Sequence, residues 1–487
     1  MNKHFWHIVI FIMSAHIMVQ AQVSDFRRAF DEFTANARAS YNTFSDSVNA
    51  DFAETLKEEW VLFKTEEAIE RSTVPEPIEA PVVTGREQQT NKAINVIEEN
   101  VVTPSRWPVP ADTAKWETSA TTSYDARYIR FTFFDAEQVV QIPREYGTFH
   151  PGGISEQDVA SFWKRLSGYD YRVILSECSK LRDAYGYNDW AILLWVQALS
   201  GAIFKNNINS EQSIFSIFIL NQLGLMAKIA RVDKDLIMLF SSQQTIYSRK
   251  FIVVDTYPYY TVEESSPAAD VFTYNTSMSV VSRPLDMHFN GVLQLGSKNS
   301  YKTYHKDSDL LGRGLSLPIN TSVTAFYSHY PQLDVNIYAS ATPDELFASS
   351  LLDSIRPSLT GKTEIESVNY LLGFCQRQFD YKTDLEQFGY EKPFFLEENF
   401  VYDYNDCEDR SILFSYLVTT LLQKPVIFLD YPGHIAAAVN LSEDIKGDYV
   451  KLGDHKYYIC DPTYIGASVG MTIPEYKNQS VKVWKIR

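Results

Sequence analysis

The amino-acid sequence predicts a multidomain α+β protein. Its 487 residues exceed what one hydrophobic core ordinarily organises, and 45% apolar with 22% charged residues is the composition of a globular chain. Helical periodicity, as in the apolar run over 189–204, alternates with short strand-like runs such as 425–429 and 435–439. We therefore expect roughly two to four domains that combine helices with antiparallel strands.

Residues 1–21 predict a signal peptide. Lys3 supplies a positive start, residues 5–19 are mostly apolar, and Val19-Gln20-Ala21 fits the small-residue cleavage rule. Cleavage near Ala21 would release an exported protein, periplasmic or extracellular. A membrane anchor is the alternative, but two histidines interrupt the apolar run, which is shorter than the ~20 residues of a spanning helix. No later stretch predicts a membrane span.

Composition and periodicity divide the rest of the chain into five parts. Residues 22–71 carry apolar side chains at helical spacing and predict a helical N-terminal segment, and the Pro-rich residues 72–114 predict a linker. Residues 115–265 predict a first folded unit, and residues 266–340 predict a β-rich spacer with strands at 277–281 and 333–339. Residues 341–487 predict the last domain. Within the first unit we expect strands over 128–134, 137–142, 236–240 and 250–255, and helices near 155–166, 169–184, 189–204 and 210–226.

Charge and cysteine content exclude several function classes. The formal charge of -17 argues against nucleic acid and anionic membrane surfaces, which require clustered Lys and Arg. The four cysteines form no CxxC pair and the chain contains no HExxH motif, so the sequence predicts neither a metal site nor a disulfide scaffold, and it indicates no cofactor. Of the four, we expect Cys407 to be the functional thiol.

Three stretches near the carboxyl end carry the candidate chemistry. Asn405 is the expected N-cap of a helix, with Glu408 completing a capping box, so Cys407 lies in the first turn, where the helix dipole favours a thiolate. His434 begins the second of two strand-like runs, and Asp461 follows a third run over 456–460. Adjacent antiparallel strands would bring the imidazole beside the carboxylate, over the helix start.

The strings DCEDRSILFSYLV, GHIAAAV and YYICDPTY resemble the three signature blocks of the transglutaminase-like superfamily, a variant of the papain-type fold, over about residues 340–487. The resemblance implies that Cys407 attacks an amide carbonyl, His434 transfers the proton and Asp461 orients the imidazole. It implies hydrolysis or acyl transfer on a peptide or protein substrate. A noncatalytic scaffold or a protein- or glycan-binding module is the alternative. Oligomeric state is not indicated.

For the other polar residues near these blocks we expect structural or solvated positions. Gln376 and Gln378 are weak candidates for an oxyanion donor and are expected to be solvated helix-face residues. Glu408, Asp409 and Arg410 at the start of the Cys407 helix are candidates for substrate binding, although a solvated first turn is the commoner explanation. His455 is expected to lie in a turn. Structural roles in apolar surroundings are expected for the remaining cysteines, Cys178, Cys375 and Cys460.

Residues 115–265 are predicted to be a degenerate copy of the last domain. The segment 212–225 aligns with 410–423, and 250–262 aligns with 456–468. In this alignment Asn209 falls on Cys407, Leu236 on His434 and Asp255 on Asp461, so the nucleophile and the base are missing. The copy would be an inactive scaffold or recognition module. Any helix followed by strands can be aligned in this way, which is the alternative explanation.

Overall fold

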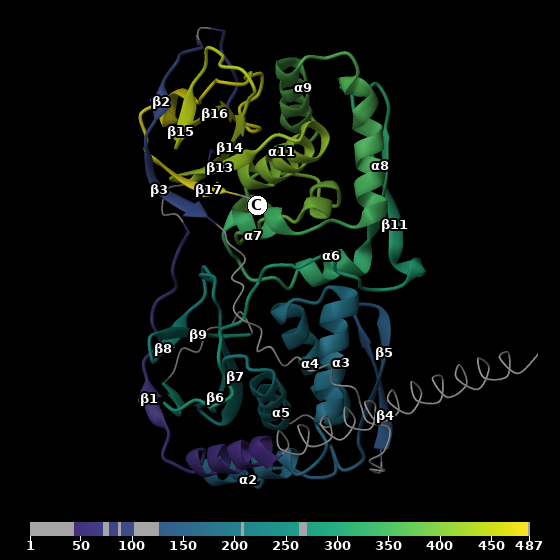
Figure 1. Ribbon diagram of the computed structural model, residues 1–487, viewed down its shortest axis with the longest axis vertical. Coiled ribbons are helices and arrows are strands. Elements are labelled where there is room, and N and C mark those ends of the chain that lie inside the picture. Colours follow the sequence, from purple (N-terminus) through teal and green to yellow (C-terminus); the bar gives the residue numbers. More distant parts are fainter. Residues whose placement is uncertain are drawn as a thin grey trace, which may run out of the picture.

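The computed structural model describes residues 43–71, 77–85, 89–101, 126–205, 209–262 and 270–485. The predicted signal peptide lies outside this part of the chain. Two α+β halves are stacked along the long axis of the molecule (Figure 1). Within the described ranges, every helix is too short or too polar to cross a lipid bilayer.

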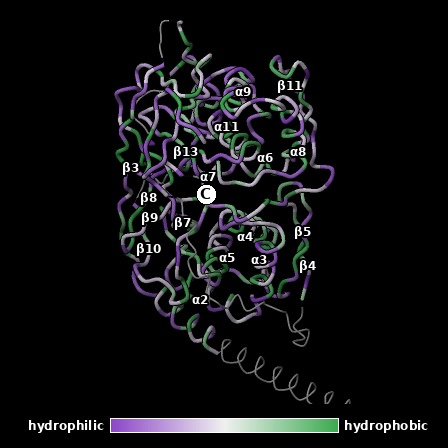
Figure 2. The backbone as a smooth tube through the Cα atoms, turned by 45° about the horizontal axis from the view of Figure 1, so that its top comes forward, coloured by the Kyte–Doolittle hydropathy of each residue, from purple (hydrophilic) through white to green (hydrophobic). Residues whose placement is uncertain are grey.

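The N-terminal half contains a six-stranded sheet, a separate hairpin and four named helices, together with a helix over 43–55. Its helices are α2 (Glu156–Ser167), α3 (Arg172–Tyr185), α4 (Asp189–Ile203) and α5 (Asn209–Gln222). Its sheet strands are β1 (Val61–Phe63), β6 (Ala227–Val232), β7 (Asp235–Ser241), β8 (Phe251–Val254), β9 (Tyr257–Thr261) and β10 (Val271–Thr273), and the hairpin is β4 (Ala126–Phe133) with β5 (Ala136–Pro143). The hydrophobic stretches of the backbone gather on the inner helices, which form the core of this half (Figure 2).

The C-terminal half is built around helix α11 and a seven-stranded sheet. Its helices are α6 (Thr321–Tyr327), α7 (Val335–Ser340), α8 (Glu345–Ile355), α9 (Glu364–Arg377), α10 (Asp384–Phe388) and α11 (Cys407–Leu422), with short 3₁₀ turns η1 (Lys298–Ser300), η2 (Arg356–Leu359), η3 (Leu396–Phe400) and η4 (Pro474–Tyr476). The sheet strands are β2 (Ala93–Ile94), β3 (Val96–Val101), β13 (Val426–Tyr431), β14 (His434–Asn440), β15 (Tyr449–Leu452), β16 (His455–Cys460) and β17 (Val481–Lys485), beside the hairpin β11 (Tyr301–Lys306) and β12 (Leu315–Asn320).

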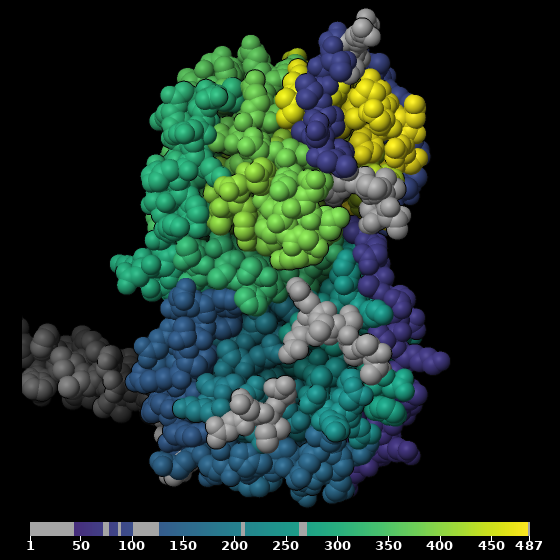
Figure 3. Space-filling view, turned by 180° about the vertical axis from the view of Figure 1, so that it is seen from behind, coloured from purple at the N-terminus to yellow at the C-terminus, as the bar shows by residue number. Residues whose placement is uncertain are grey.

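The predicted linker is part of the C-terminal sheet. Strands β2 and β3, separated by one residue, form its two opposite edges, pairing in parallel with β15 and β17 respectively. Because the two edges lie so close along the chain, the sheet must curl until they meet. Side chains of one face, such as Leu429 and Ala438, form a core inside this curl, whereas Phe428 and Ala437 on the other face join the core that includes α11. Residues 89–101 lie against the C-terminal strands in Figure 3.

For two other segments the predicted secondary structure is wrong in part. Residues 61–63 form strand β1, so the N-terminal segment is not wholly helical, and the predicted β-rich spacer is mixed. The predicted strand over 333–339 is mostly helix α7, and 277–281 forms no strand. The alternating apolar pattern there reflects burial of single residues within irregular chain and a short helix.

The two large sheets share one strand order. Read from one side, it is β10-β6-β7-β9-β8 in the N-terminal half and β17-β13-β14-β16-β15 in the C-terminal half, and every neighbouring pair in these runs is antiparallel. Helix α5 precedes the first sheet and packs on it, as α11 does for the second. The two halves therefore contain the same helix-and-sheet topology.

This shared topology corrects the predicted residue correspondence. Strand β9, not β8, occupies the place of β16, so Asp255 in the turn after β8 does not correspond to Asp461. The pair Val232–Asp235 closes the first hairpin, as Tyr431 pairs with His434 in the second, so Asp235 rather than Leu236 matches the histidine. Asn209 begins α5 as Cys407 begins α11. Sequence alignment missed strand β6 and shifted the match.

Candidate active site

Cys407 is the first residue of helix α11, as the sequence predicts. The N-cap is Asp406, whose backbone N–H donates to the Asp409 carboxyl group at 3.3 Å, so the capping pair lies one residue later than expected. Asn405 is instead buried, and its side-chain amide donates to Asn399 at 2.6 Å. The positive end of the helix dipole still faces the thiol, an arrangement that favours a thiolate.

The structure brings His434 and Asp461 together. The tight β13–β14 hairpin places His434 at the first position of β14, and β16 pairs with β14 so that its last residue, Cys460, lies opposite Ala437 and the chain continues toward the start of β14. Nε2 of His434 lies 2.8 Å from Oδ2 of Asp461, and the other oxygen of Asp461 accepts the Thr463 backbone N–H at 2.9 Å. Both the imidazole and the carboxylate are buried, with residue exposures of 2% and 3%.

The Cys407 sulfur lies next to the histidine. The backbone N–H of Ile435, the residue after His434, donates to Sγ at 3.4 Å, which by covalent geometry keeps the sulfur within about 6 Å of the His434 Cα. The thiol donates to Oε2 of Glu408 at 3.0 Å, while Nδ1 of His434 is buried and has no hydrogen-bond partner among the described residues. With Nε2–H given to Asp461, Nδ1 carries the lone pair that a general base needs.

Two tyrosines that the sequence analysis did not single out pack on the imidazole. The Tyr476 ring stacks on His434 with centroids 4.9 Å apart and an interplanar angle of 16°, and Tyr431 lies at 6.5 Å. Both rings are almost wholly buried. They limit rotation of the histidine ring and exclude water from one side of the His434–Asp461 pair. No local pattern marks Tyr476, because it reaches the site from a separate 3₁₀ turn.

The acidic first turn of α11 is buried, contrary to the predicted solvated turn. Glu408 is fully buried and forms an ion pair at 2.8 Å with Arg71 from the N-terminal half. Burial acts to raise the pKa of Glu408, but Arg71 and the Cys407 thiol more than offset it, so this pKa lies below its ordinary value. Arg410 is also buried and donates to the Phe379 carbonyl at 2.8 Å, which ties α11 to α9.

Further carboxyl groups surround the first turn. Burial and then the neighbouring Asp409 raise the pKa of Asp384 well above its ordinary value, and burial and then Glu408 raise the pKa of Asp409 in the same way. Burial and Glu408 raise the pKa of Glu391 to about 7. Three overlapping sets of side chains have ligand atoms close enough together to hold a metal ion, and the sequence predicted none of them. These sets are Asp406–Cys407–Glu408, Asp384–Asp406–Asp409 and Asp384–Glu391–Glu408. Backbone N–H groups donate to Asp384 and Asp409, and Arg71 pairs with Glu408, so these three carboxyl groups have partners within the protein.

Neither glutamine candidate faces the thiol as an oxyanion donor. Gln376 is buried, not solvated as predicted, and its amide nitrogen donates to the carbonyls of Asp461 and Ala467 at 3.3 and 3.0 Å. It therefore positions the loop that carries Asp461. Gln378 is partly exposed and donates to the Asp307 carbonyl at 2.8 Å.

The other three cysteines are free and buried in apolar surroundings. Burial raises the pKa of Cys178 to about 12, and burial also raises the pKa values of Cys375 and Cys460. Such thiols are chemically inert at neutral pH. His455 is exposed at the start of β16, next to the β15–β16 turn.

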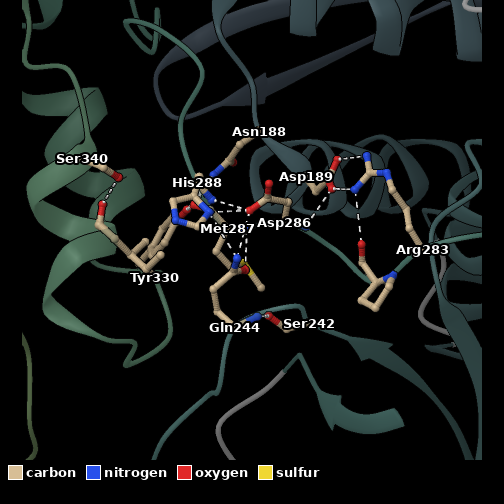
Figure 4. Close-up of polar contacts among 12 residues, drawn as sticks. Asn188, Asp189, Ser242, Gln244, Arg283, Asp286, Met287, His288, Tyr330 and Ser340 are labelled. Carbon is tan, nitrogen blue, oxygen red and sulfur yellow. Dashed lines mark hydrogen bonds and ion pairs between the residues drawn. The ribbon is translucent and has the colours of Figure 1, made fainter. Parts of the chain in front are cut away.

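A second histidine–aspartate pair, buried His288 with half-buried Asp286, lies near Tyr330 (Figure 4). Nδ1 of His288 lies 2.7 Å from Oδ1 of Asp286, and this oxygen also accepts the Gln244 amide at 3.1 Å. Oδ2 of Asp189 accepts the Asp286 backbone N–H, and Asp189 also pairs with Arg283. All four cysteines are placed elsewhere, so this network has no thiol and is a connection between chain segments.

Comparison with known proteins identifies no relative. No protein-family model, no curated protein and no solved structure matches this chain. Function must therefore be inferred from the site itself.

Proposed function

We propose that the C-terminal half is a cysteine-dependent amide-bond hydrolase or acyl transferase that acts on peptides or proteins. The carrying observation is the buried 2.8 Å contact between His434 Nε2 and Asp461, together with a buried Nδ1 that has no described partner and a Cys407 sulfur that accepts the backbone N–H of the next residue, Ile435. A helix that presents the thiol and packs on the antiparallel centre of a curled sheet supports a papain-type, transglutaminase-like fold. The predicted leader supports an exported enzyme.

In the proposed reaction, Nδ1 of His434 takes the Cys407 proton and the thiolate attacks the amide carbonyl carbon. The imidazolium, stabilised by Asp461, then protonates the leaving amine, so that the C–N bond breaks and a thioester with Cys407 remains. His434 next takes a proton from water, hydroxide attacks the thioester, and the acid and the free thiol are released. An amine in place of water would give a new amide. Hydrolysis is favoured because water is abundant. The backbone N–H of Cys407 is the proposed donor to the oxyanion.

A noncatalytic binding module is the second candidate. It is favoured by the complete burial of Cys407 and by the thiol's hydrogen bond to Glu408 instead of His434. In that case the site would be a structural network within a scaffold.

Site-resolved alkylation and peptide cleavage distinguish the two candidates. Iodoacetamide is expected to modify Cys407 faster than Cys375 at neutral pH, and His434→Ala is expected to abolish the difference. A peptide mixture analysed by mass spectrometry should show cleavages or transfers that disappear with Cys407→Ala and persist with Cys375→Ala. Equal alkylation of both cysteines together with no Cys407-dependent product would establish the binding module instead.

A further inference from the structure

A guanidinium, a carboxylate and the candidate nucleophile lie in a row. Nη1 of Arg71 contacts Oε1 of Glu408 at 2.8 Å, and the other oxygen of Glu408 accepts the Cys407 thiol at 3.0 Å. The Arg71 side chain is only 13% exposed and that of Glu408 is fully buried. Arg71 comes from a segment more than three hundred residues away in the chain. Its charge is therefore placed beside the nucleophile by tertiary structure alone.

Several acidic groups act on Arg71, and Glu408 contacts it directly. Burial alone would lower the pKa of Arg71, but Glu408, Asp430, the Cys407 thiol and Glu391 together raise it well above its ordinary value. An unpaired buried carboxylate is costly, so Glu408 requires a cation for as long as it is ionised.

Residues 64–71, which we call the strap, hold Arg71 in place from the N-terminal half. The backbone N–H of Glu66 donates to the Phe251 carbonyl at 2.7 Å. The Ile69 carbonyl accepts the Ser248 backbone N–H at 2.9 Å, and the Ser248 hydroxyl donates to Glu70 at 2.9 Å. The strap is thus fixed to strand β8 and to the loop before it, and it ends at the catalytic centre of the other half.

We propose that Arg71 is an internal plug in a cation-binding subsite beside Cys407, and that a substrate peptide displaces it with its own arginine or lysine side chain. This inference rests on the proposed function. A guanidinium or ammonium group can pair with Glu408 as Arg71 does, whereas a neutral group would leave the buried carboxylate unpaired. While the plug is in place, the thiol hydrogen bond goes to Glu408, and the basic Nδ1 of His434 has no described partner.

The test measures the rate at which iodoacetamide alkylates Cys407 in the full chain. Mass spectrometry distinguishes this cysteine from the others. Arg71→Ala is expected to raise the Cys407 rate at least tenfold. Addition of N-acetylarginine amide should restore slow alkylation in this variant, whereas N-acetylcitrulline amide, of similar shape but uncharged, should not. Glu67→Gln alters an exposed ion pair of the same strap with Lys250 and should alkylate as the wild type does. Unchanged slow reaction of Cys178 and Cys375 shows that every variant is folded.

If Arg71→Ala destabilises the fold, the double variant Arg71→Ala with Glu408→Gln removes both charges; it should react faster than wild type and ignore N-acetylarginine amide. An unchanged Cys407 rate in folded Arg71 variants would overturn the plug. Equal effects of the arginine and citrulline compounds would overturn the cation subsite. Faster, arginine-sensitive alkylation without any peptide turnover would support the subsite and contradict the catalytic proposal, so the two failures are distinguishable.

Discussion

Replacing Asp461 by asparagine tests the proposed triad with little change in shape. Its Oδ1 can still accept the Thr463 backbone N–H, which is 2.9 Å away in the native protein. At the other position, however, an amide N–H₂ replaces the oxygen that lies 2.8 Å from His434 Nε2. Two donors cannot face each other, so the imidazole must move its proton to Nδ1. The nitrogen that should act as base toward Cys407 then carries a proton instead of a lone pair.

The expected loss follows from this contact. A hydrogen bond to a charged group contributes about 1.5–3 kcal/mol, which alone corresponds to roughly a 10- to 150-fold change in rate. Because the imidazole also takes the wrong tautomer, the total loss is larger, and we expect kcat/KM to fall by about 10² to 10⁴-fold. The assay is cleavage of a peptide shown to depend on Cys407. The control is Asp444→Asn, which alters an exposed carboxylate paired with Lys456 at 2.6 Å. Activity of Asp461→Asn within threefold of wild type would refute the assigned role.

Three further predictions concern the packing around the site. Tyr476→Ala should lower kcat about tenfold by freeing the His434 ring, whereas Tyr476→Phe should keep most activity, because the ring stack of 4.9 Å is retained. Ile94→Ala should destabilise the protein by about 2–5 kcal/mol in urea unfolding, because this buried side chain of the predicted linker fills the core of the C-terminal sheet; an effect below ~0.5 kcal/mol would show that the segment is dispensable. Glu397 is buried, and burial raises its pKa to about 7 from 4.5. Between about pH 4.5 and pH 7 the native protein therefore binds more protons than the unfolded protein. The contribution of Glu397 to the free energy of unfolding is fully present below about pH 4.5 and should be lost as the pH rises toward 7, by on the order of 3 kcal/mol. Glu397→Gln should flatten that slope; an unchanged slope would contradict the assignment.

Local signals explain why the placement of Cys407 and His434 in the fold could be predicted. The Cys407 helix has capping residues and a continuous apolar pattern, and the turn before His434 contains Pro432 and Gly433, with Gly433 in the left-handed region that favours glycine. Each of these features depends on a few consecutive residues. The shift of the cap from Asn405 to Asp406 shows the limit of such reasoning, because several polar residues in a row can each serve as a cap.

Features that depend on distant partners were not predictable. Strands β2 and β3 contain few residues and lie in a Pro-rich segment, and only pairing with β15 and β17 makes them strands. Burial of Glu408 likewise depends on Arg71, which no sequence spacing relates to it. A run of acids at a helix start is ordinarily solvated, so the prediction followed the commoner case, and the tertiary ion pair reversed it.

The two halves share a topology and are joined through the loop before β8. Asp235 is exposed at the hairpin position that His434 occupies in the C-terminal half, so the first sheet carries a carboxyl group there instead of an imidazole. Its loop before β8 instead binds the strap through Ser248, and Tyr247 in the same loop donates to Asp334 of the other half at 2.7 Å. The N-terminal half is thereby joined both to the strap that carries Arg71 and to the C-terminal half. If Arg71 acts as the proposed plug, separating Tyr247 from Asp334 would also loosen the strap, and the N-terminal half would then control access to Cys407.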